Sequence, residues 1–101
     1  VTQAVRDTNT DAGAVTTGDW IGIVRGDGIV AIAGSVVSAS TELLSHIVGE
    51  DAELLTVVTG SEATAAHTEA INAWVGENHP DVAVEVHRGG QPLYPYLFGV
   101  E

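Results

Sequence analysis

Residues 53–59 read Glu-Leu-Leu-Thr-Val-Val-Thr, a run that is apolar on both faces of a strand. This pattern is typical of a central strand, because a strand covered on both sides needs no polar alternation. A helix is expected next, from about Glu62 to Asn78, with Ser61 as its N-cap and Pro80-Asp81 closing it. Helical spacing predicts an inward-facing set made of Ala63, Ala66, Ala70, Ile71, Trp74 and Val75.

Residues 81–88 then alternate, with Val82, Val84 and Val86 sharing one face. A strand, a helix and a second strand in this order predict a βαβ unit. The last extended segment covers residues 94–100, and Pro95 confines its beginning to a sheet edge or to the first position of a strand.

The first half of the chain predicts strands joined by turns. Strands are expected at 3–6, 20–25 and 29–33, with a polar, turn-rich connection at 7–13. Gly26-Asp27-Gly28 between two apolar runs indicates a hairpin, and Gly22 inside a strand indicates a bulge or a close backbone contact. A first helix would present Leu43, Leu44, Ile47 and Val48, with Ser38 or Ser40 as N-cap and Gly49 as its stop.

The predicted fold class is therefore α+β (mixed α/β). An N-terminal β-hairpin layer (1–36) precedes an αβαβ part (37–101) that holds the βαβ unit, the final C-terminal strand and the two main helices. We expect residues 1–101 to form a single domain that is a C-terminal fragment of a larger multidomain protein.

The charge of the chain excludes several classes of partner. The net charge is −11, lysine is absent, and the three fixed cations are Arg6, Arg25 and Arg88. Nucleic acids and anionic membranes are bound through basic clusters, so neither nucleic-acid binding nor membrane insertion is expected. A salt-adapted or high-GC source explains this acidity, and so does a basic partner surface. The lack of cysteine excludes disulfides and thiolate metal sites and fits a cytoplasmic setting.

No motif in the sequence predicts a catalytic, cofactor-binding or metal-binding residue. Residues 26–31 fit G-x-G-x-x-A, but that fingerprint requires a helix where this sequence stays β-like. The four histidines (46, 67, 79 and 87) include no i, i+4 pair. His87 lies at a strand end beside a Gly-Gly turn, and it is the one histidine for which a catalytic role is weighed against a structural one. The carboxylates Asp7, Asp11, Asp19 and Glu50-Asp51-Glu53 are expected to be solvated loop charges.

The last fifteen residues hold three of the five aromatic residues: Tyr94, Tyr96 and Phe98. A core strand uses such side chains, and so does a surface patch for a partner. Alternation places the three on one face, so some of them must fill the core while Leu93, Leu97 and Arg88 lie near the surface.

The residues of this ending resemble a known family. Val-Glu-Val-His-Arg-Gly-Gly-Gln-Pro-Leu-Tyr-Pro-Tyr-Leu-Phe-Gly-Val-Glu at 84–101 is similar to the C-terminus of the fatty-acid kinase A-subunit family, also described as dihydroxyacetone-kinase-like or as proteins with a dihydroxyacetone-kinase phosphatase domain. Residues 4–8 (Ala-Val-Arg-Asp-Thr), 18–22 (Gly-Asp-Trp-Ile-Gly) and 54–60 (Leu-Leu-Thr-Val-Val-Thr-Gly) resemble segments of the same family in the same order.

The resemblance implies a function for the parent protein. Its N-terminal domain would bind ATP and Mg²⁺ and phosphorylate a fatty acid held by a separate carrier protein, and the C-terminal region is associated with docking that carrier. No catalytic residue carries over to this chain, so the fragment is expected not to be an enzyme. The expected partners are this fatty-acid-binding carrier subunit and the rest of the same polypeptide. We expect the partner-binding residues to be His87, Arg88, Gly89, Gly90, Gln91, Tyr94 and Tyr96.

Two other functions stay open. One is a domain of a dihydroxyacetone (glycerone) kinase-like enzyme, in which a histidine binds the sugar and His87 is the one candidate. The other is a structural module that forms a homodimer through a self-complementary aromatic patch.

Overall fold

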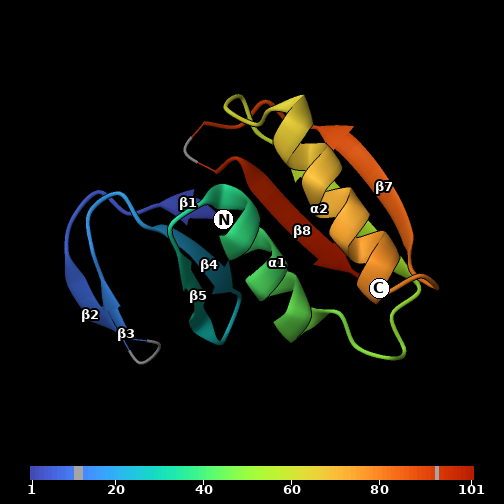
Figure 1. The fold of residues 1–101 in the computed structure, drawn as a ribbon, viewed down its shortest axis with the longest axis horizontal. Helices are drawn as coiled ribbons and strands as arrows, with labels where there is room; N and C mark the ends of the chain where they lie inside the picture. Colours follow the sequence, from blue (N-terminus) through green and yellow to red (C-terminus); the bar gives the residue numbers. More distant parts are fainter. Residues whose placement is uncertain (11–12, 93) are drawn as a thin grey trace.

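The chain forms the mixed α+β structure that the sequence predicts (Figure 1). The computed structural model describes residues 1–10, 13–92 and 94–101. The described residues form β1 (Thr2–Gln3), β2 (Thr8–Thr10), β3 (Gly13–Val15), β4 (Trp20–Val24), β5 (Gly28–Ala33), α1 (Val36–Ile47), β6 (Leu54–Thr59), α2 (Ala65–Asn78), β7 (Ala83–Arg88) and β8 (Tyr96–Val100).

The predicted βαβ unit is confirmed. Strand β6 is the middle strand of the sheet β7-β6-β8, parallel to β7 and antiparallel to β8. The side chains of Leu55 and Val57 are fully buried in it, and Ile71 and Val75 of α2 are buried with them. Strand β8 is an edge strand among the described residues, as Pro95 before it indicates.

The predicted details of α2 are partly wrong. The helix begins at Ala65 with Thr64 as N-cap, because the hydroxyl of Thr64 accepts a hydrogen bond from the amide of His67 at 3.1 Å. The amide of Ser61 donates to the carbonyl oxygen of Gln91 at 3.0 Å. Ala66 and Ala70 are exposed, and Trp74 is only half-buried. Alanine favours helices whichever way it faces, so its spacing gives little information about which side is buried.

The β4–β5 hairpin and the special position of Gly22 are confirmed. A Cβ at Gly22 would lie 3.0 Å from the Cβ of Leu43 and 3.1 Å from the Cβ of Ala31. The pairing of β4 with β5 also shifts register between Gly22 and Ile23. Gly22 therefore allows α1 to pack directly on β4, and it lies at a bulge.

Helix α1 begins earlier than predicted, at Val36. The hydroxyl of Ser35 accepts a hydrogen bond from the amide of Ser38 at 3.1 Å, so neither Ser38 nor Ser40 is the N-cap. Ser40 lies in the core, where its hydroxyl donates to the carbonyl oxygen of Val36 at 2.7 Å. Val36 adds one turn to the buried face of the helix. The burial of this turn outweighs the preference of Ser38 and Ser40 for the N-cap position.

The early segment contains strands where a turn-rich connection was expected. Strands β2 and β3 pair antiparallel, with Thr8 opposite Val15, and β1 covers only Thr2–Gln3 rather than 3–6. The sequence of β2 is Thr-Asn-Thr, which has no apolar alternation and so gives no strand signal. Asp11 lies outside the described residues.

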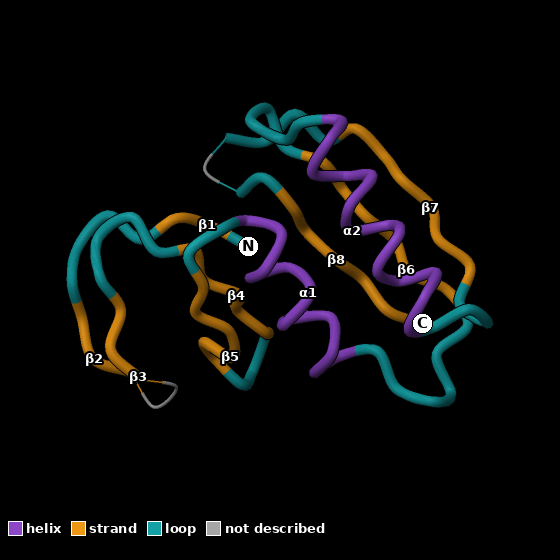
Figure 2. Tube along the Cα trace, viewed as in Figure 1, coloured by secondary structure: helices purple, strands orange, loops and turns teal. Residues whose placement is uncertain are grey.

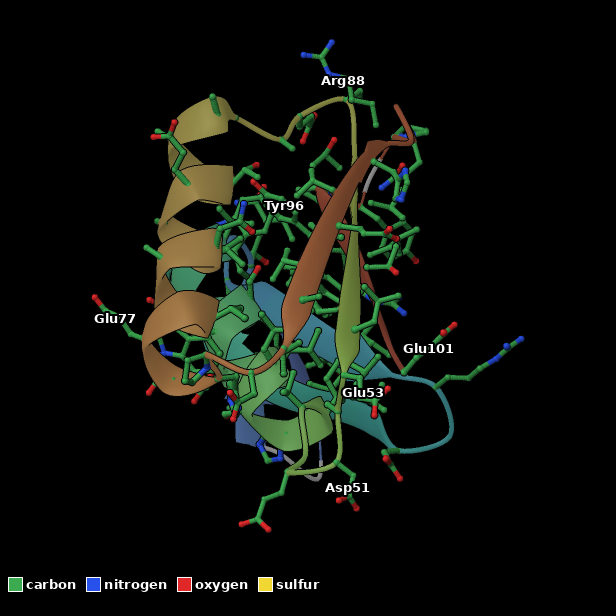
Figure 3. The ribbon with its side chains drawn as sticks, turned by 90° about the vertical axis from the view of Figure 1, so that its right-hand side faces the viewer. Asp51, Glu53, Glu77, Arg88, Tyr96 and Glu101 are labelled. Atoms are coloured by element: carbon green, nitrogen blue, oxygen red, sulfur yellow. The ribbon has the colours of Figure 1, made fainter. Side chains whose placement is uncertain are left out.

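The elements form two layers around one core. Helices α1 and α2 lie on the same side of the strands (Figures 1 and 3), and Figure 2 shows β8 running between the other strands of its sheet and the β1-β4-β5 sheet. The core takes side chains from both three-stranded sheets, both helices and the residues beside them: Val1, Ala31, Val36, Ala39, Leu43, Leu44, Val48, Leu55, Val57, Ile71, Val75 and Tyr96. Neither helix of the described residues has the length and apolarity needed to cross a membrane.

In the chain 1–101, the free amine of Val1 lies beside this core. This amine donates to the carbonyl oxygen of Tyr96 at 2.8 Å, and burial lowers the pKa of the amine from 8.0 to about 6. Below pH 6 the amine is protonated in both the folded and the unfolded chain, so the cost of burying the charge is fully present. Above pH 8 it is neutral in both states and the cost is absent.

We therefore expect chain 1–101 with a free amine at Val1 to gain stability as the pH rises from 6 to 8. The gain is at most about 2.7 kcal/mol, from two pKa units. Urea titrations at pH 6 and pH 8 measure it, with the Nα-acetylated chain as control, because acetylation removes the charge but keeps the N–H donor and all other titrating groups. Equal pH dependence in the two chains would contradict the prediction.

Candidate functional site

The predicted partner-binding residues lie where β6 and β7 end and where β8 begins. His87 and Arg88 are the last two residues of β7, and Gly89 to Gln91 continue from it. Figure 3 shows Arg88 projecting away from the body of the molecule at this end. The structure thus brings together the predicted residues of the stretch 87–96 at one end of the β7-β6-β8 sheet.

The backbone of this stretch is held by the end of β6. The amides of Gly89 and Gly90 donate to the carbonyl oxygen of Thr59 at 2.9 and 3.0 Å. The amide of Gly60 donates to the carbonyl oxygen of Pro95 at 2.7 Å, next to the bond from Ser61 to Gln91 described above. Four backbone hydrogen bonds therefore tie the segment that follows β7 to residues 59–61.

The side chain of Gln91 adds two further hydrogen bonds between these segments. Its Nε2 donates to the carbonyl oxygens of Val58 at 3.3 Å and of Tyr94 at 3.0 Å. Gln91 is half-buried and spans from the central strand to the residues that lead into β8. The sequence predicts Gln91 as a partner-binding residue, and the structure shows that its side chain positions the backbone between β6 and β8.

Two glycines make the close contact between these segments possible. A Cβ at Gly60 would collide with the carbonyl oxygen of Tyr94 and would lie 2.8 Å from that of Gln91. Gly90 has a φ of +67°, which residues with a side chain rarely adopt. The sequence signalled the turn at Gly89-Gly90, whereas nothing in the pattern around Gly60 showed that it faces the residues leading into β8.

Tyr96 lies on the buried side of the stretch 87–96, which is called the motif below. Its side chain is fully buried between α2 and the sheet (Figure 3), and its hydroxyl shares a hydrogen bond of 2.7 Å with the hydroxyl of Thr68. Burial raises the pKa of Tyr96, while the bond to Thr68 opposes that rise. Its ring stacks on Phe98, with 5.9 Å between the ring centroids. These contacts fix the C-terminal end of the stretch 87–96 to the core.

The remaining predicted residues face solvent. His87, Arg88, Gly89, Gly90 and Tyr94 are exposed, Tyr94 by 41%. The Nε2 atom of His87 lies 3.6 Å from a carboxylate oxygen of Glu85, and both side chains are more than half exposed. Leu97 is 45% exposed, as predicted, and Leu93 lies outside the described residues.

A cavity adjoins Arg88 at the beginning of α2. It has a volume of about 280 Å³ and is lined by Thr59, Thr64, Thr68, Glu69, Val86 and Arg88, among others. The lining combines hydroxyl groups, one cation and one carboxylate beside apolar stems. Such a mixed, open surface suits contact with a polar protein surface more than capture of an apolar ligand.

Asp7 and Asp19, which the sequence analysis expects to be solvated loop charges, both accept hydrogen bonds. Asp7 accepts hydrogen bonds from the amide and the hydroxyl of Thr17, which lower the pKa of Asp7, and Asp19 accepts from the amide of Thr16. Residues 26–31 form the β4–β5 turn and strand β5, not the start of a helix. His46 and His67 are exposed, and the described residues contain no metal-binding cluster of histidine and carboxylate side chains.

Comparison with known proteins gives one family. The model of the C-terminal family of fatty acid kinase A-subunit-like proteins matches residues 1–101. Uncharacterized proteins of Staphylococcus aureus strains USA300 and COL are each 43% identical over 101 residues, and one of strain MRSA252 is 42% identical. These alignments cover 100% of this chain but 18% of each relative.

Proposed function

Since this chain belongs to the C-terminal family of fatty acid kinase A-subunit-like proteins, we propose that it is a non-catalytic docking and scaffolding domain of a fatty-acid-kinase-type protein. Other domains of that protein would bind ATP and Mg²⁺ and carry out phosphoryl transfer in the cytoplasm. The domain described here would hold the carrier protein that binds the fatty acid.

The observation that supports docking is a set of exposed side chains on a fixed backbone. Arg88 and Tyr94 face solvent, while hydrogen bonds from Gly60, Ser61, Gly89 and Gly90 hold the segment between them. A surface that is already ordered loses little conformational entropy when a partner binds. Arginine and tyrosine are also enriched where binding energy is concentrated at protein interfaces.

Arg88 would set the electrostatics of this surface. The chain has a net charge of −11, and Arg88 is the one fixed cation among the described residues that line the cavity at the beginning of α2, where Glu69 is the one carboxylate. We propose that Arg88 pairs with an acidic group of the carrier. A charge pair of this kind guides the orientation of the complex and discriminates against other partners.

Replacing Arg88 by glutamate should weaken the carrier complex at least tenfold, or about 1.4 kcal/mol. The melting temperature should change little, because Arg88 is exposed at the end of an edge strand. Calorimetric titration of the full-length protein with its carrier measures the affinity. Arg6→Glu is the matched control: it makes the same change of charge at an exposed site in the β1–β2 connection.

Equal carrier affinity for Arg88→Glu and the parent would place the docking surface elsewhere. Equal losses in Arg88→Glu and Arg6→Glu would mean that overall charge, not a pair at Arg88, controls binding. If Arg88→Glu instead changed self-association at unchanged carrier affinity, this surface would be a dimer contact.

A further inference from the structure

A groove separates the two three-stranded sheets, between β4 and β8. Ile23 and Val24 of β4 form one wall and Leu97 and Phe98 of β8 the other, while Leu43 and Ile47 of α1 form the floor. Val1 lines the groove as well, and the volume is about 290 Å³. Figure 1 shows the N-terminus at one end of this boundary, with β8 beside it.

The β8 wall of the groove is a strand edge. Glu101 and Leu54 each donate a backbone hydrogen bond to the other. In an antiparallel pair such bonds recur at every second residue, so Gly99 and Leu97 also bond to β6. The backbone groups of Tyr96 and Phe98 therefore point away from β6, into the groove. The carbonyl oxygen of Tyr96 confirms this direction, because it accepts the hydrogen bond from Val1.

The β4 wall is a strand edge too. β1 pairs with β4 only through Thr2 opposite Ile21 and Gln3 opposite Trp20. The amide of Ala4 donates to the carbonyl oxygen of Asp19 at 2.8 Å, so the alternation that continues from this pair directs Ile21 toward β1 and Ile23 toward the groove. Beyond Ile21, the β1 side of β4 has no neighbouring strand within the described residues.

We propose that the segment leading into Val1 in the longer protein runs through this groove as an extension of β1. It would pair with β4 on one side and with β8 on the other, antiparallel to both. The two sheets would then become one sheet with the strand order β5-β4-β1-β8-β6-β7, with both helices on one face.

The position of Val1 favours this occupant over a separate molecule. The nitrogen of Val1 lies inside the groove and is hydrogen-bonded to its β8 wall, so any residue that precedes Val1 has to start there. The matching family is described as C-terminal, and the relatives are far longer than this chain. A peptide nitrogen would make the same hydrogen bond without a charge to bury.

The register specifies what the first two preceding residues meet. Continuing from Thr2 opposite Ile21, Val1 lies opposite Gly22, the residue before it opposite Ile23, and the next opposite Val24. The first of the two would face the same side as Ile23, which is 45% exposed. The second would face α1 beside Leu43 and Ile47, so we expect an apolar side chain there.

Amide hydrogen exchange in the full-length protein tests the proposal. The amides of Ile23 and Phe98 should exchange slowly, as in paired strands. Replacing both residues before Val1 with proline removes their N–H donors and should speed these two amides on the order of 100-fold. Replacing the same two residues with threonine is the control and should leave the protection in place.

Three results would overturn the proposal. The first is exchange of Ile23 and Phe98 in the unmodified full-length protein at the rate of an unstructured peptide, a result that needs no variant. The second is equal protection in the proline and threonine variants. The third is protection that disappears on dilution, because that would mean a second copy fills the groove.

Discussion

Replacing Tyr96 with alanine is expected to destabilise the chain by about 3–5 kcal/mol, the range for removing a large aromatic side chain from a core. Tyr96 is the largest fully buried side chain among the described residues. Its hydroxyl hydrogen-bonds to the hydroxyl of Thr68 in α2 and to the carbonyl oxygen of the N-cap Thr64, and its ring stacks on Phe98. Its loss would leave a cavity between α2 and the sheet, which neither rigid element can close.

Tyr96→Phe separates the ring from the hydroxyl. Phenylalanine keeps the packing but leaves the Thr68 hydroxyl without its 2.7 Å partner, so we expect a loss of about 1–2 kcal/mol. Urea titration of both variants gives the comparison. Equal losses would show that the hydroxyl, not the ring, carries the stability, and a loss under about 1 kcal/mol for Tyr96→Ala would contradict the burial of this side chain.

The β6–α2–β7 part of the fold was predictable from the sequence because its signals are local and redundant. The run at 54–58 is apolar on both faces, and β6 is indeed the middle strand. The hairpin at Gly26-Asp27-Gly28 was equally clear, because only glycine accepts the φ values of +90° and +78° found there at low cost.

The parts that were missed depend on contacts between distant residues. Ser61 and Thr64 are both good N-caps by residue type, so the local pattern does not choose between them. In the structure Thr64 caps the helix, and the amide of Ser61 bonds to Gln91, thirty residues away. The β2–β3 hairpin is polar and is anchored by the burial of Val15, which alternation cannot detect in a three-residue strand. Local pattern cannot encode either effect.

The candidate site shows the same division. The sequence placed Arg88 near the surface and the turn at Gly89-Gly90, whereas the edge position of β7 is known only from the structure. The two hydrogen bonds that Gln91 Nε2 donates to the carbonyl oxygens of Val58 and Tyr94 could not be predicted. They depend on how Val58 and Tyr94 lie relative to each other in the folded chain. The sequence thus predicts which residues bind a partner, and the structure shows the hydrogen bonds that fix their backbone.

The contact between Gly60 and the residues leading into β8 gives the second large effect. Gly60→Ala is expected to cost about 3 kcal/mol, the upper part of the range for overpacking. The new Cβ would meet the carbonyl oxygens of Tyr94 and Gln91 and lie 3.1 Å from the Cα of Pro95. All three are backbone atoms, so no side-chain rotation can relieve the collision, and the 2.7 Å bond from Gly60 to Pro95 would have to lengthen.

Gly49→Ala is the matched control, because a Cβ at Gly49 would have no atom within 4 Å. We expect it to change stability by less than about 1 kcal/mol, and in the stabilising direction if the backbone conformation suits alanine. Thermal and urea unfolding measure both variants.

Gly60→Ala should also weaken carrier binding by the full-length protein, because displacing the backbone of Gln91 and Tyr94 moves Tyr94 relative to Arg88. A Gly60→Ala variant as stable as Gly49→Ala would show that residues 59–61 do not pack against the motif, and the fixed backbone proposed for docking would then lose its support.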